Sequence, residues 1–312
     1  MQNLSMLFKL NKSFWLKKVL EFCLCVIAIV FLSYLLIYLP KFFQPGPIRD
    51  WFPTLEQFFH YLKTISHPAE ILFTTTSISV GVERTYKFII YHSNSYVYSI
   101  GILLFSIITT ILFGLLMSYF YMNSGRKIKK VIESIAVFIE SIPDLMFIFT
   151  FQLLFIWIYR TTGWLPIRIM SFGEDQAWLL PILCAVLIPT LQFFRVVLLF
   201  GKSEMSQMYV EFAYSRGFGK GYIIRNHVLR NILRNLLNQY SSIYVFTLSN
   251  LFIIERAFNI NGFMGFFLQP SLKEITPELV FIWLLMLFLP FFIIRTFIEY
   301  IVHLVLGGEV NA

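Results

Sequence analysis

The chain has 312 residues, of which 58% are hydrophobic and 13% are charged, and its mean hydropathy is +0.73. Soluble globular domains carry about 25% charged residues, and half that fraction cannot cover the surface of a soluble protein of this size. The composition therefore argues against a large soluble domain and against a disordered chain. It indicates an all-α protein that crosses the membrane several times.

Charge, histidine and cysteine content give no sign of a nucleic-acid-binding, metal-binding or disulfide-rich protein. The net charge of +8 is interpreted first through the excess of Lys and Arg in cytoplasmic loops, and not through nucleic-acid binding. The five histidines are scattered without the spacing of metal ligands, and the three cysteines do not form a disulfide framework. We expect no metal site in this chain.

Six apolar runs approach or exceed the roughly 20 residues that a membrane-spanning helix needs. The third run is long, and Pro143 predicts a kink or tilt within it. The first run follows lysines as a signal peptide would, but no cleavage site follows it, so a retained helix is predicted. The runs are Val19–Leu39, Val97–Met122, Val131–Tyr159, Trp178–Phe200, Leu236–Ile254 and Leu279–Phe297.

The distribution of basic residues predicts the orientation. Fifteen of the 25 Lys and Arg residues fall at the N-terminus and in the loops on the same side of the membrane, and nine fall on the other side. The richer side is expected to be cytoplasmic, so both termini are predicted to lie in the cytoplasm.

The segment between the first two spans is predicted to be a small ordered element outside the cytoplasm. It opens with four prolines within Pro40–Pro53 and continues with aromatic and β-branched residues. We divide the chain into residues 1–96, which hold the N-terminal segment, the first span and this loop, and residues 97–312, which hold the remaining transmembrane domain.

The strongest local signal lies in residues 209–235, which read YVEFAYSRGFGKGYIIRNHVLRNILRN. The pattern predicts a short helix, a glycine-rich turn at Gly217–Gly221 and a basic amphipathic helix that lies along the membrane surface. From the residues alone, an anchor that contacts lipid phosphate and a docking element for a protein are equally supported. The glycines lack the spacing and the preceding strand of a phosphate-binding loop.

This segment resembles the EAA loop of ABC importer permeases, in the variant of the dipeptide, oligopeptide and nickel branch. Glu211, Ala213 and Gly217 carry the resemblance together with His227–Asn231, which follow ten residues later. Phe212 and Asn235 depart from the motif. The flanking segments that also match include Tyr209-Val210, Leu180-Pro181, Arg195 to Glu204, Ser141-Ile142-Pro143, Gly163–Pro166, Glu255–Phe258, Gly262 and Gly265. The resemblance covers roughly residues 97–297, and the first span with its long loop fits the "B"-type subunit.

The resemblance implies a type I permease fold with six transmembrane helices and a cytoplasmic coupling helix. In similar permeases this helix docks on an ATPase, and ATP and Mg²⁺ are used by that partner and not by the permease, which is no enzyme. The implied partners are a second permease subunit in a heterodimer, cytoplasmic ABC ATPases, an extracellular substrate-binding protein and membrane lipid, but no nucleic acid. The coupling residues implied are Glu211, Ala213, Arg216, Gly217, Phe218 and Lys220.

Four of these coupling residues also have another interpretation. Glu211 pairs with a basic residue of the ATPase, caps the local helix, or is simply a solvated charge. Gly217 permits a left-handed turn and is equally an ordinary helix C-cap. Arg216 and Lys220 contact either acidic ATPase residues or lipid.

Charged groups inside the apolar runs are costly and usually face a bundle interior or water. The spacing of Glu133, Glu140 and Asp144 by seven and four residues predicts one shared helical face. Glu140, Ser141, Asp144 and Arg195 are candidates for a translocation path. A structural pairing of Asp144 and Arg195 satisfies the cost of burial equally well. Asp144 stands where the branch usually has Ser.

The predicted function is that of a transmembrane permease subunit of an ATP-driven ABC importer, for peptides or a related small solute. The alternatives are an ion-coupled secondary transporter or another polytopic membrane protein. Against the secondary transporter, the sequence shows neither an internal repeat nor paired broken spans. A membrane enzyme lacks support because no nucleophile–base pair lies on an accessible loop.

Overall fold

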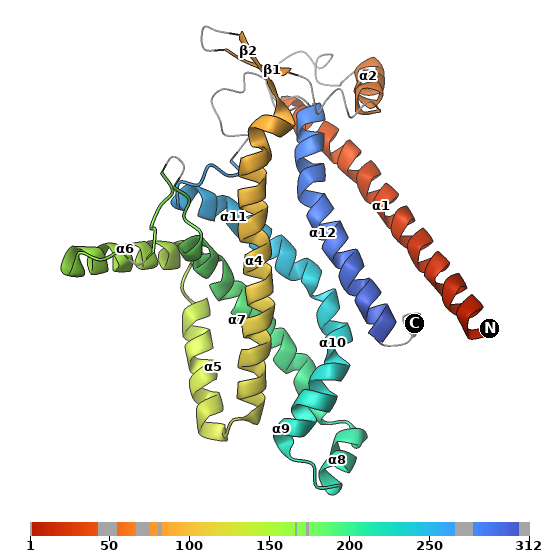
Figure 1. Ribbon diagram of the computed structural model, residues 1–312, viewed down its shortest axis with the longest axis vertical. Coiled ribbons are helices and arrows are strands. Elements are labelled where there is room, and N and C mark those ends of the chain that lie inside the picture. The colour runs from red at the N-terminus through yellow and green to blue at the C-terminus, as the bar shows by residue number, and fades with distance from the viewer. Residues whose placement is uncertain are drawn as a thin grey trace. The chain divides into compact units, whose positions relative to one another are not determined.

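The computed structural model describes residues 2–42, 55–66, 75–79, 83–165, 167–172, 175–265 and 277–305. The chain forms two compact units. The first contains Met1–Ser93 and Phe267–Ala312, and the second contains Asn94–Phe266. Each unit is described by itself, and Figure 1 labels the elements of both.

The first unit contains α1 (Gln2–Phe42), α2 (Leu55–Ile65), a two-stranded antiparallel hairpin and α12 (Pro277–Val305). The hairpin is formed by β1 (Thr75–Ser79) and β2 (Glu83–Lys87), with Ser77 opposite Thr85. The segment between the first two predicted spans thus includes ordered elements, as the sequence predicts. In the described part of this segment they are α2 and the paired strands β1 and β2.

Aromatic and charged contacts join α1 to α12 within the first unit. The Phe22 ring lies 5.1 Å from the Phe292 ring, centroid to centroid. The Nζ of Lys18 lies 2.6 Å from Glu21 of its own helix and 2.6 Å from Glu299 of α12. Lys18 is buried, and two carboxylates offset its desolvation, as a buried ammonium requires.

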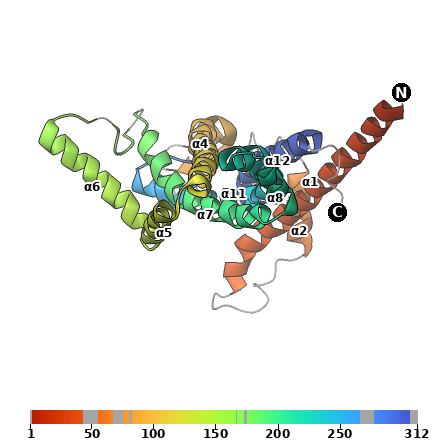
Figure 2. The ribbon, with the colours of Figure 1, turned by 90° about the horizontal axis from the view of Figure 1, so that it is seen from below.

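The second unit takes most of α4 (Phe88–Asn123), then α5 (Arg126–Glu140), α6 (Asp144–Thr162) and α7 (Leu179–Met205). The third apolar run, predicted as one kinked span, is two separate helices. Proline cannot donate to the helical ladder and pushes the preceding residue out of the helical region, so α5 ends at Glu140 and α6 begins after Pro143. Figures 1 and 2 show α6 projecting away from α5 and α4.

The remaining elements of the second unit follow α7 without a long connection. They are α8 (Met208–Ser215), α9 (Lys220–Ile223), the π-helix η2 (Ile224–Val228), α10 (Leu229–Asn238) and α11 (Tyr240–Ala257). The predicted amphipathic helix of residues 222–234 is therefore a run of three joined helical segments, and α10 packs against α7. Ile223, Ile224, Val228 and Ile232 of its apolar stripe are buried, whereas Leu233 is exposed.

Five of the described helices are long and apolar enough to cross a membrane. The predicted span Leu236–Ile254 falls on α10 and α11. α11 has 18 residues and carries Glu255 and Arg256 in its last turn, and it is not among the five. The prediction of a helical membrane protein is confirmed, with five such helices where six were predicted. They are Phe14–Tyr38, Ser93–Asn123, Asp144–Thr162, Leu179–Met205 and Pro277–Tyr300.

A buried carboxylate fixes the chain that follows α11. Glu255 is 1% exposed, and its side chain accepts hydrogen bonds from Ser99 Oγ at 2.6 Å and from the Gly265 amide at 3.1 Å. Ser99 Oγ in turn accepts a bond from the Phe263 amide at 2.7 Å. Three segments of chain, namely α4, the end of α11 and the stretch after α11, thus meet at one polar cluster. Gly262 lies against the carboxylate with no room for a side chain.

Replacing Gly262 with alanine is expected to destabilise this cluster. The added Cβ lies 2.1 Å from Glu255 Cδ, so either the buried carboxylate or the backbone must move. Overpacking of this kind costs about 1–3 kcal/mol. We expect a lower Tm for the detergent-purified Gly262→Ala protein.

The control for that experiment is Gly125→Ala at the start of α5. An added Cβ at Gly125 meets no atom within 4 Å, and its φ of −74° suits any residue. Equal Tm values for the two variants would contradict a packing role for Gly262.

Candidate coupling segment and charged groove

A glycine in the left-handed conformation ends α8. Gly217 has a φ of 84°; its amide donates to Tyr214 O at 2.9 Å, and the Phe218 amide donates to Ala213 O at 3.2 Å. This pair of bonds is the Schellman motif, which satisfies the last carbonyls of a helix. An added Cβ at Gly217 meets no atom within 4 Å. The glycine is needed here for its backbone conformation and not for a close approach.

One face of the segment 208–223, called the α8 knob below, is anchored in a hydrophobic core. Val210 and Ala213 of α8 are buried in it, together with residues of α4, α7, α9 and η2. The Tyr121 ring of α4 meets the Phe194 ring of α7 edge to face at 5.6 Å. Each fully buried Ile or Val side chain contributes about 1.5–3 kcal/mol relative to exposure, so the knob is firmly attached to two long helices. The core consists of Tyr121, Met122, Phe194, Leu198, Val210, Ala213, Ile223, Ile224 and Val228.

The opposite face of the α8 knob exposes large apolar side chains. Met208 is 87% exposed and Phe212 is 57% exposed. The rings of Phe218 and Tyr222 stack at 5.0 Å, and both are exposed. Contiguous exposed apolar side chains beside charged ones are typical of a surface that binds another protein.

The predicted coupling residues divide between these two faces. Ala213 is buried in the core, whereas Glu211 is exposed in the first turn of α8. The Arg216 guanidinium lies over the Phe212 ring, 4.4 Å from its centroid. Burial and the nearby ammonium of Lys129 lower the pKa of Lys220. The knob therefore presents cations beside aromatic rings.

A hydrogen-bond cluster ties the knob to α7 and α10. Tyr209 Oη donates to Glu204 Oε1 at 2.8 Å, and Asn231 Nδ2 donates to the same oxygen at 3.2 Å. Burial and the Glu204 carboxylate raise the pKa of Tyr209 to about 12, so its hydroxyl remains a donor at neutral pH. Tyr209 and Asn231 both belong to the segment singled out in the sequence.

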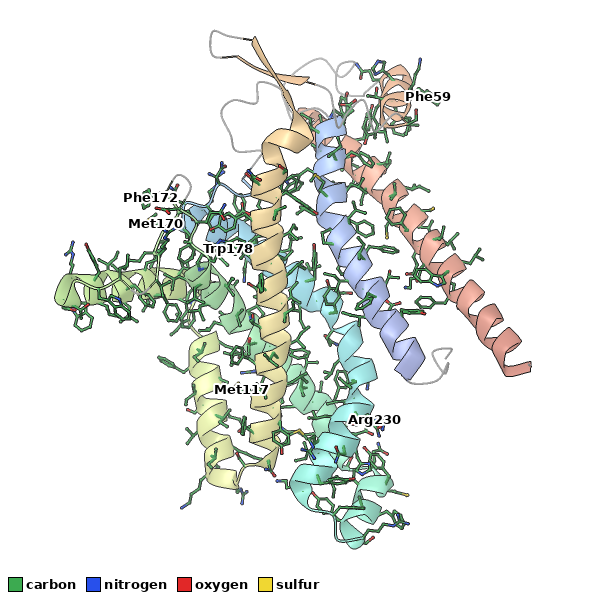
Figure 3. The ribbon with its side chains drawn as sticks, viewed as in Figure 1. Phe59, Met117, Met170, Phe172, Trp178 and Arg230 are labelled. Carbon is green, nitrogen blue, oxygen red and sulfur yellow. The ribbon has the colours of Figure 1, made fainter. Side chains whose placement is uncertain are left out.

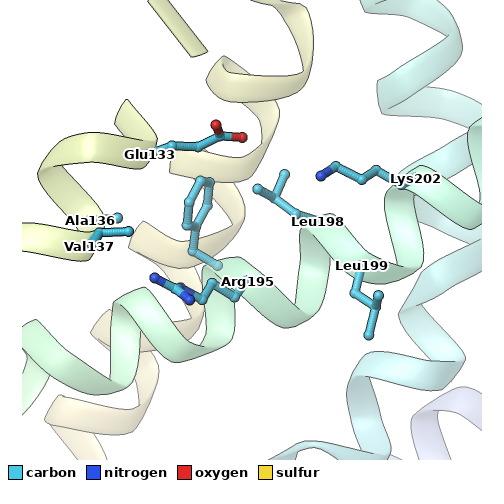
Figure 4. Close-up of a pocket in the computed structure, with 8 residues that line it drawn as sticks. Glu133, Ala136, Val137, Arg195, Leu198, Leu199 and Lys202 are labelled. Atoms are coloured by element: carbon cyan, nitrogen blue, oxygen red, sulfur yellow. The ribbon is translucent and has the colours of Figure 1, made fainter. Parts of the chain in front are cut away.

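A groove of about 370 Å³ lies between α5 and α7 (Figure 4). Glu133 of α5 and two cations of α7, Arg195 and Lys202, line it along with apolar side chains. Arg195 forms a salt bridge with Glu140, and Tyr121 Oη donates a hydrogen bond to Glu133. The other carboxylate oxygen of Glu140, Oε1, is buried and has no hydrogen-bond partner among the described residues.

The three carboxylates that were predicted to share one helical face lie on two helices. The break before α6 separates Asp144 from Glu140, so the expected alignment of Glu133, Glu140 and Asp144 is wrong. Asp144 instead accepts a hydrogen bond from Asn250 Nδ2 of α11 at 2.8 Å. Ser141 lies at the break, where its Oγ donates to Val137 O at 2.7 Å. Arg195 is thus paired with Glu140 and not with Asp144.

The family model of the binding-protein-dependent transport system inner membrane component matches residues 110–306 of this chain. The match covers more than half of the sequence and includes the α8 knob, the α5–α7 groove and α12. The chain belongs to this family. No curated protein matches the sequence.

This family membership makes the chain a multi-pass membrane permease subunit of an ABC transporter and not a catalytic enzyme. The match confirms the prediction of an ABC transporter permease subunit. It favours this function over an ion-coupled secondary transporter. The roles of the coupling and path residues stay predictions, as does the division of the permease at residues 96 and 97.

Several residues that shape the permease were not singled out as functional from the sequence. Met208 and Tyr222 extend the exposed face of the knob, and Ser99 pairs with Glu255 across 156 positions of sequence. No local pattern marks Ser99, because its partner is set by the packing of α4 against the end of α11. The hydrophobic residues next to the motif at 209–217 are the sequence signal from which the full exposed face of the knob could have been predicted.

A charge exchange tests whether the Arg195–Glu140 pair holds α5 against α7 in the permease. Arg195→Glu or Glu140→Arg alone places like charges together and should lower the Tm, whereas the double variant should recover most of the loss. Because Arg195 is half exposed, we expect a coupling free energy of about 1 kcal/mol at most from a double-mutant cycle.

The matched control is the pair Arg168–Asp175, which joins two exposed residues at 2.7 Å. Its coupling should lie near zero because both side chains are well solvated. A double variant Arg195→Glu/Glu140→Arg that is no more stable than either single variant would contradict the pairing.

Proposed function

We propose that this permease subunit works in an ATP-driven importer, with the α8 knob as the docking surface for a cytoplasmic ABC ATPase. The observation that carries the proposal is the division of the knob into two faces. Its outer face exposes Met208, Phe212 and the Phe218–Tyr222 stack, while its inner face is built into the core with α4 and α7. An exposed lipid anchor needs no such core beneath it.

The same core supplies the coupling mechanism. A displacement of the docked knob by ATPase closure is passed to Tyr121 and Met122 at the end of α4 and to Phe194 and Leu198 of α7. Packed side chains have little compressibility, so the two helix ends follow the knob. ATP and Mg²⁺ are bound by the ATPase partner in this proposal, and this chain binds neither.

The path that these helices open is proposed to include Glu140, Ser141, Asp144 and Arg195. Both signs of charge are available there. Glu140 retains an unpartnered oxygen, and Arg195 and Lys202 face the α5–α7 groove. This mixture suits a solute that carries both an amine and a carboxylate, as a peptide does, and peptides are the substrate class that we propose.

The assembly proposed around this chain contains a second permease subunit in a heterodimer, two ATPase subunits and an extracellular substrate-binding protein. Large exposed apolar side chains on α6, including Phe149, Leu153 and Trp157, are available for lipid or for the second permease. The excess of Lys and Arg in the N-terminal segment and in residues 126–130 and 202–234 supports the proposal that both termini lie in the cytoplasm, with the chain in the inner membrane of a bacterial cell.

The variant Gly217→Val tests the docking proposal. Valine is strained at a φ of 84°, so the last turn of α8 and the position of Phe218 should change while the membrane helices stay intact. We expect the full transporter, reconstituted in proteoliposomes, to lose most of its transport-coupled ATP hydrolysis.

Gly219→Val is the matched control for this variant. Gly219 lies two residues further along, also has no atom within 4 Å of an added Cβ, and has an ordinary φ of −67°. Unchanged coupled hydrolysis in the Gly217→Val transporter, with the protein present in the membrane, would show that the knob is not the coupling surface.

A further inference from the structure

A polar pocket of about 760 Å³ lies in the second unit, where α4 begins and α11 ends. Its walls come from the start of α4, from the loop before α7 and from the residues after α11, and they include Asn94, Gln176, Arg256 and Asn261. Small-molecule sites usually measure about 300–1,000 Å³, so the pocket has the size of a solute site.

The pocket lies at the opposite end of α4 from the α8 knob. Asn94 and Tyr98 line the pocket, whereas Tyr121 and Met122 pack beneath the knob, and 28 helical residues separate Asn94 from Met122 over about 40 Å. In Figure 3, Trp178, whose ring lies at a tilt 4.6 Å from the Tyr98 ring, is well away from Arg230 of α10. With the knob in the cytoplasm, the pocket lies on the side from which an importer receives its solute.

Hydrogen bonds hold the walls of the pocket in place. Ser171 accepts a bond on its Oγ from the Ala177 amide at 3.0 Å and one on its carbonyl from Asn259 Nδ2 at 3.0 Å. The Tyr98 hydroxyl reaches the Ala177 carbonyl and the Ser171 hydroxyl, and the Ser171 amide donates to Phe258 O at 2.9 Å. These bonds join the three walls, which are the start of α4, the loop before α7 and the end of α11. The site is therefore formed before a ligand binds.

One cation and several neutral donors face this space. Among the nine lining residues, all of them described, Arg256 alone is ionised, and amide and hydroxyl groups supply most of the rest. No carboxylate of the described chain forms a salt bridge with Arg256, whose guanidinium donates to the Gly265 carbonyl at 3.3 Å. Its neighbour Glu255 points into the Ser99 cluster and is occupied there.

We propose that this pocket is the outer receiving site of the transporter and that Arg256 binds a carboxylate of the solute there. Guanidinium matches the two oxygens of a carboxylate with two parallel hydrogen bonds, and the amides of Asn94, Gln176 and Asn261 can bond the remaining polar groups. The site selects for solutes with a free carboxylate. This inference rests on the proposed importer function.

The test compares tri-L-alanine with its C-terminal amide in proteoliposomes that contain the whole transporter and its binding protein. The measured quantity is the ratio of kcat/KM for the acid to kcat/KM for the amide. Any preference of the binding protein for the acid over the amide is the same for all variants, so it cancels when their ratios are compared. In Arg256→Gln the preference for the acid should fall about tenfold, because a charged hydrogen-bond pair is lost.

Two further variants separate charge recognition from structural damage. Arg256→Lys keeps the positive charge and should retain much of the preference for the acid. Arg168→Gln removes a nearby exposed cation that pairs with Asp175 outside the pocket, and it should leave the ratio unchanged.

An unchanged ratio in Arg256→Gln would overturn the receiving site and leave the importer proposal intact. Equal losses for both probes, together with weaker binding of the binding protein, would also overturn it and identify the pocket as a protein docking surface. If the intact transporter hydrolyses ATP but imports neither probe, both the peptide proposal and this inference are wrong.

Discussion

The packing of Val210 and Ala213 against the ends of α4 and α7 is the interaction on which the proposed coupling of this permease depends. Without that core, α8 would be a short helix of eight residues between two loops, and an isolated helix of that length is unstable in water. With it, the apolar outer face of the knob has a fixed position. A force applied there reaches two membrane-spanning helices directly.

Polar contacts organise the opposite end of the second unit in a comparable way. Glu255 is buried, and hydroxyl and amide donors satisfy its carboxylate in place of a cation. Ser171, Tyr98 and Asn259 connect the neighbouring loop to α4 and to the end of α11. Both ends of α4 are thus cross-linked to other elements, by side-chain packing at one end and by hydrogen bonds at the other.

The sequence predicted the class of fold, the membrane character and the short helix that ends at a glycine turn in residues 208–217, because each depends on local pattern. Apolar runs mark the helices, and Gly217 predicts a left-handed C-cap that the structure contains. The strength of the break at Pro143 was underestimated. A proline within a long apolar run can bend a helix or end it, and packing around the break decides between these outcomes.

The pairings of charged residues could not be predicted in the same way. Glu140 and Asp144 are one helical turn apart in sequence, which suggested a common face, yet their partners lie on α7 and α11 respectively. Arg195 could have paired with either carboxylate. Its choice depends on how α7 crosses α5, which is a property of the tertiary packing and leaves no trace in the spacing of residues.

The central claim is that the knob and the ends of its helices move as one body, and a distance measurement tests it most directly. Spin labels are placed at Ser215 on α8 and Asn123 at the end of α4, both exposed, after replacement of Cys23, Cys25 and Cys184. Pulsed electron paramagnetic resonance is recorded on the assembled, hydrolytically active transporter with and without ATP. The account predicts the same distance distribution in both conditions. A nucleotide-dependent shift between these two labels would show that the knob moves independently of α4 and would contradict the account.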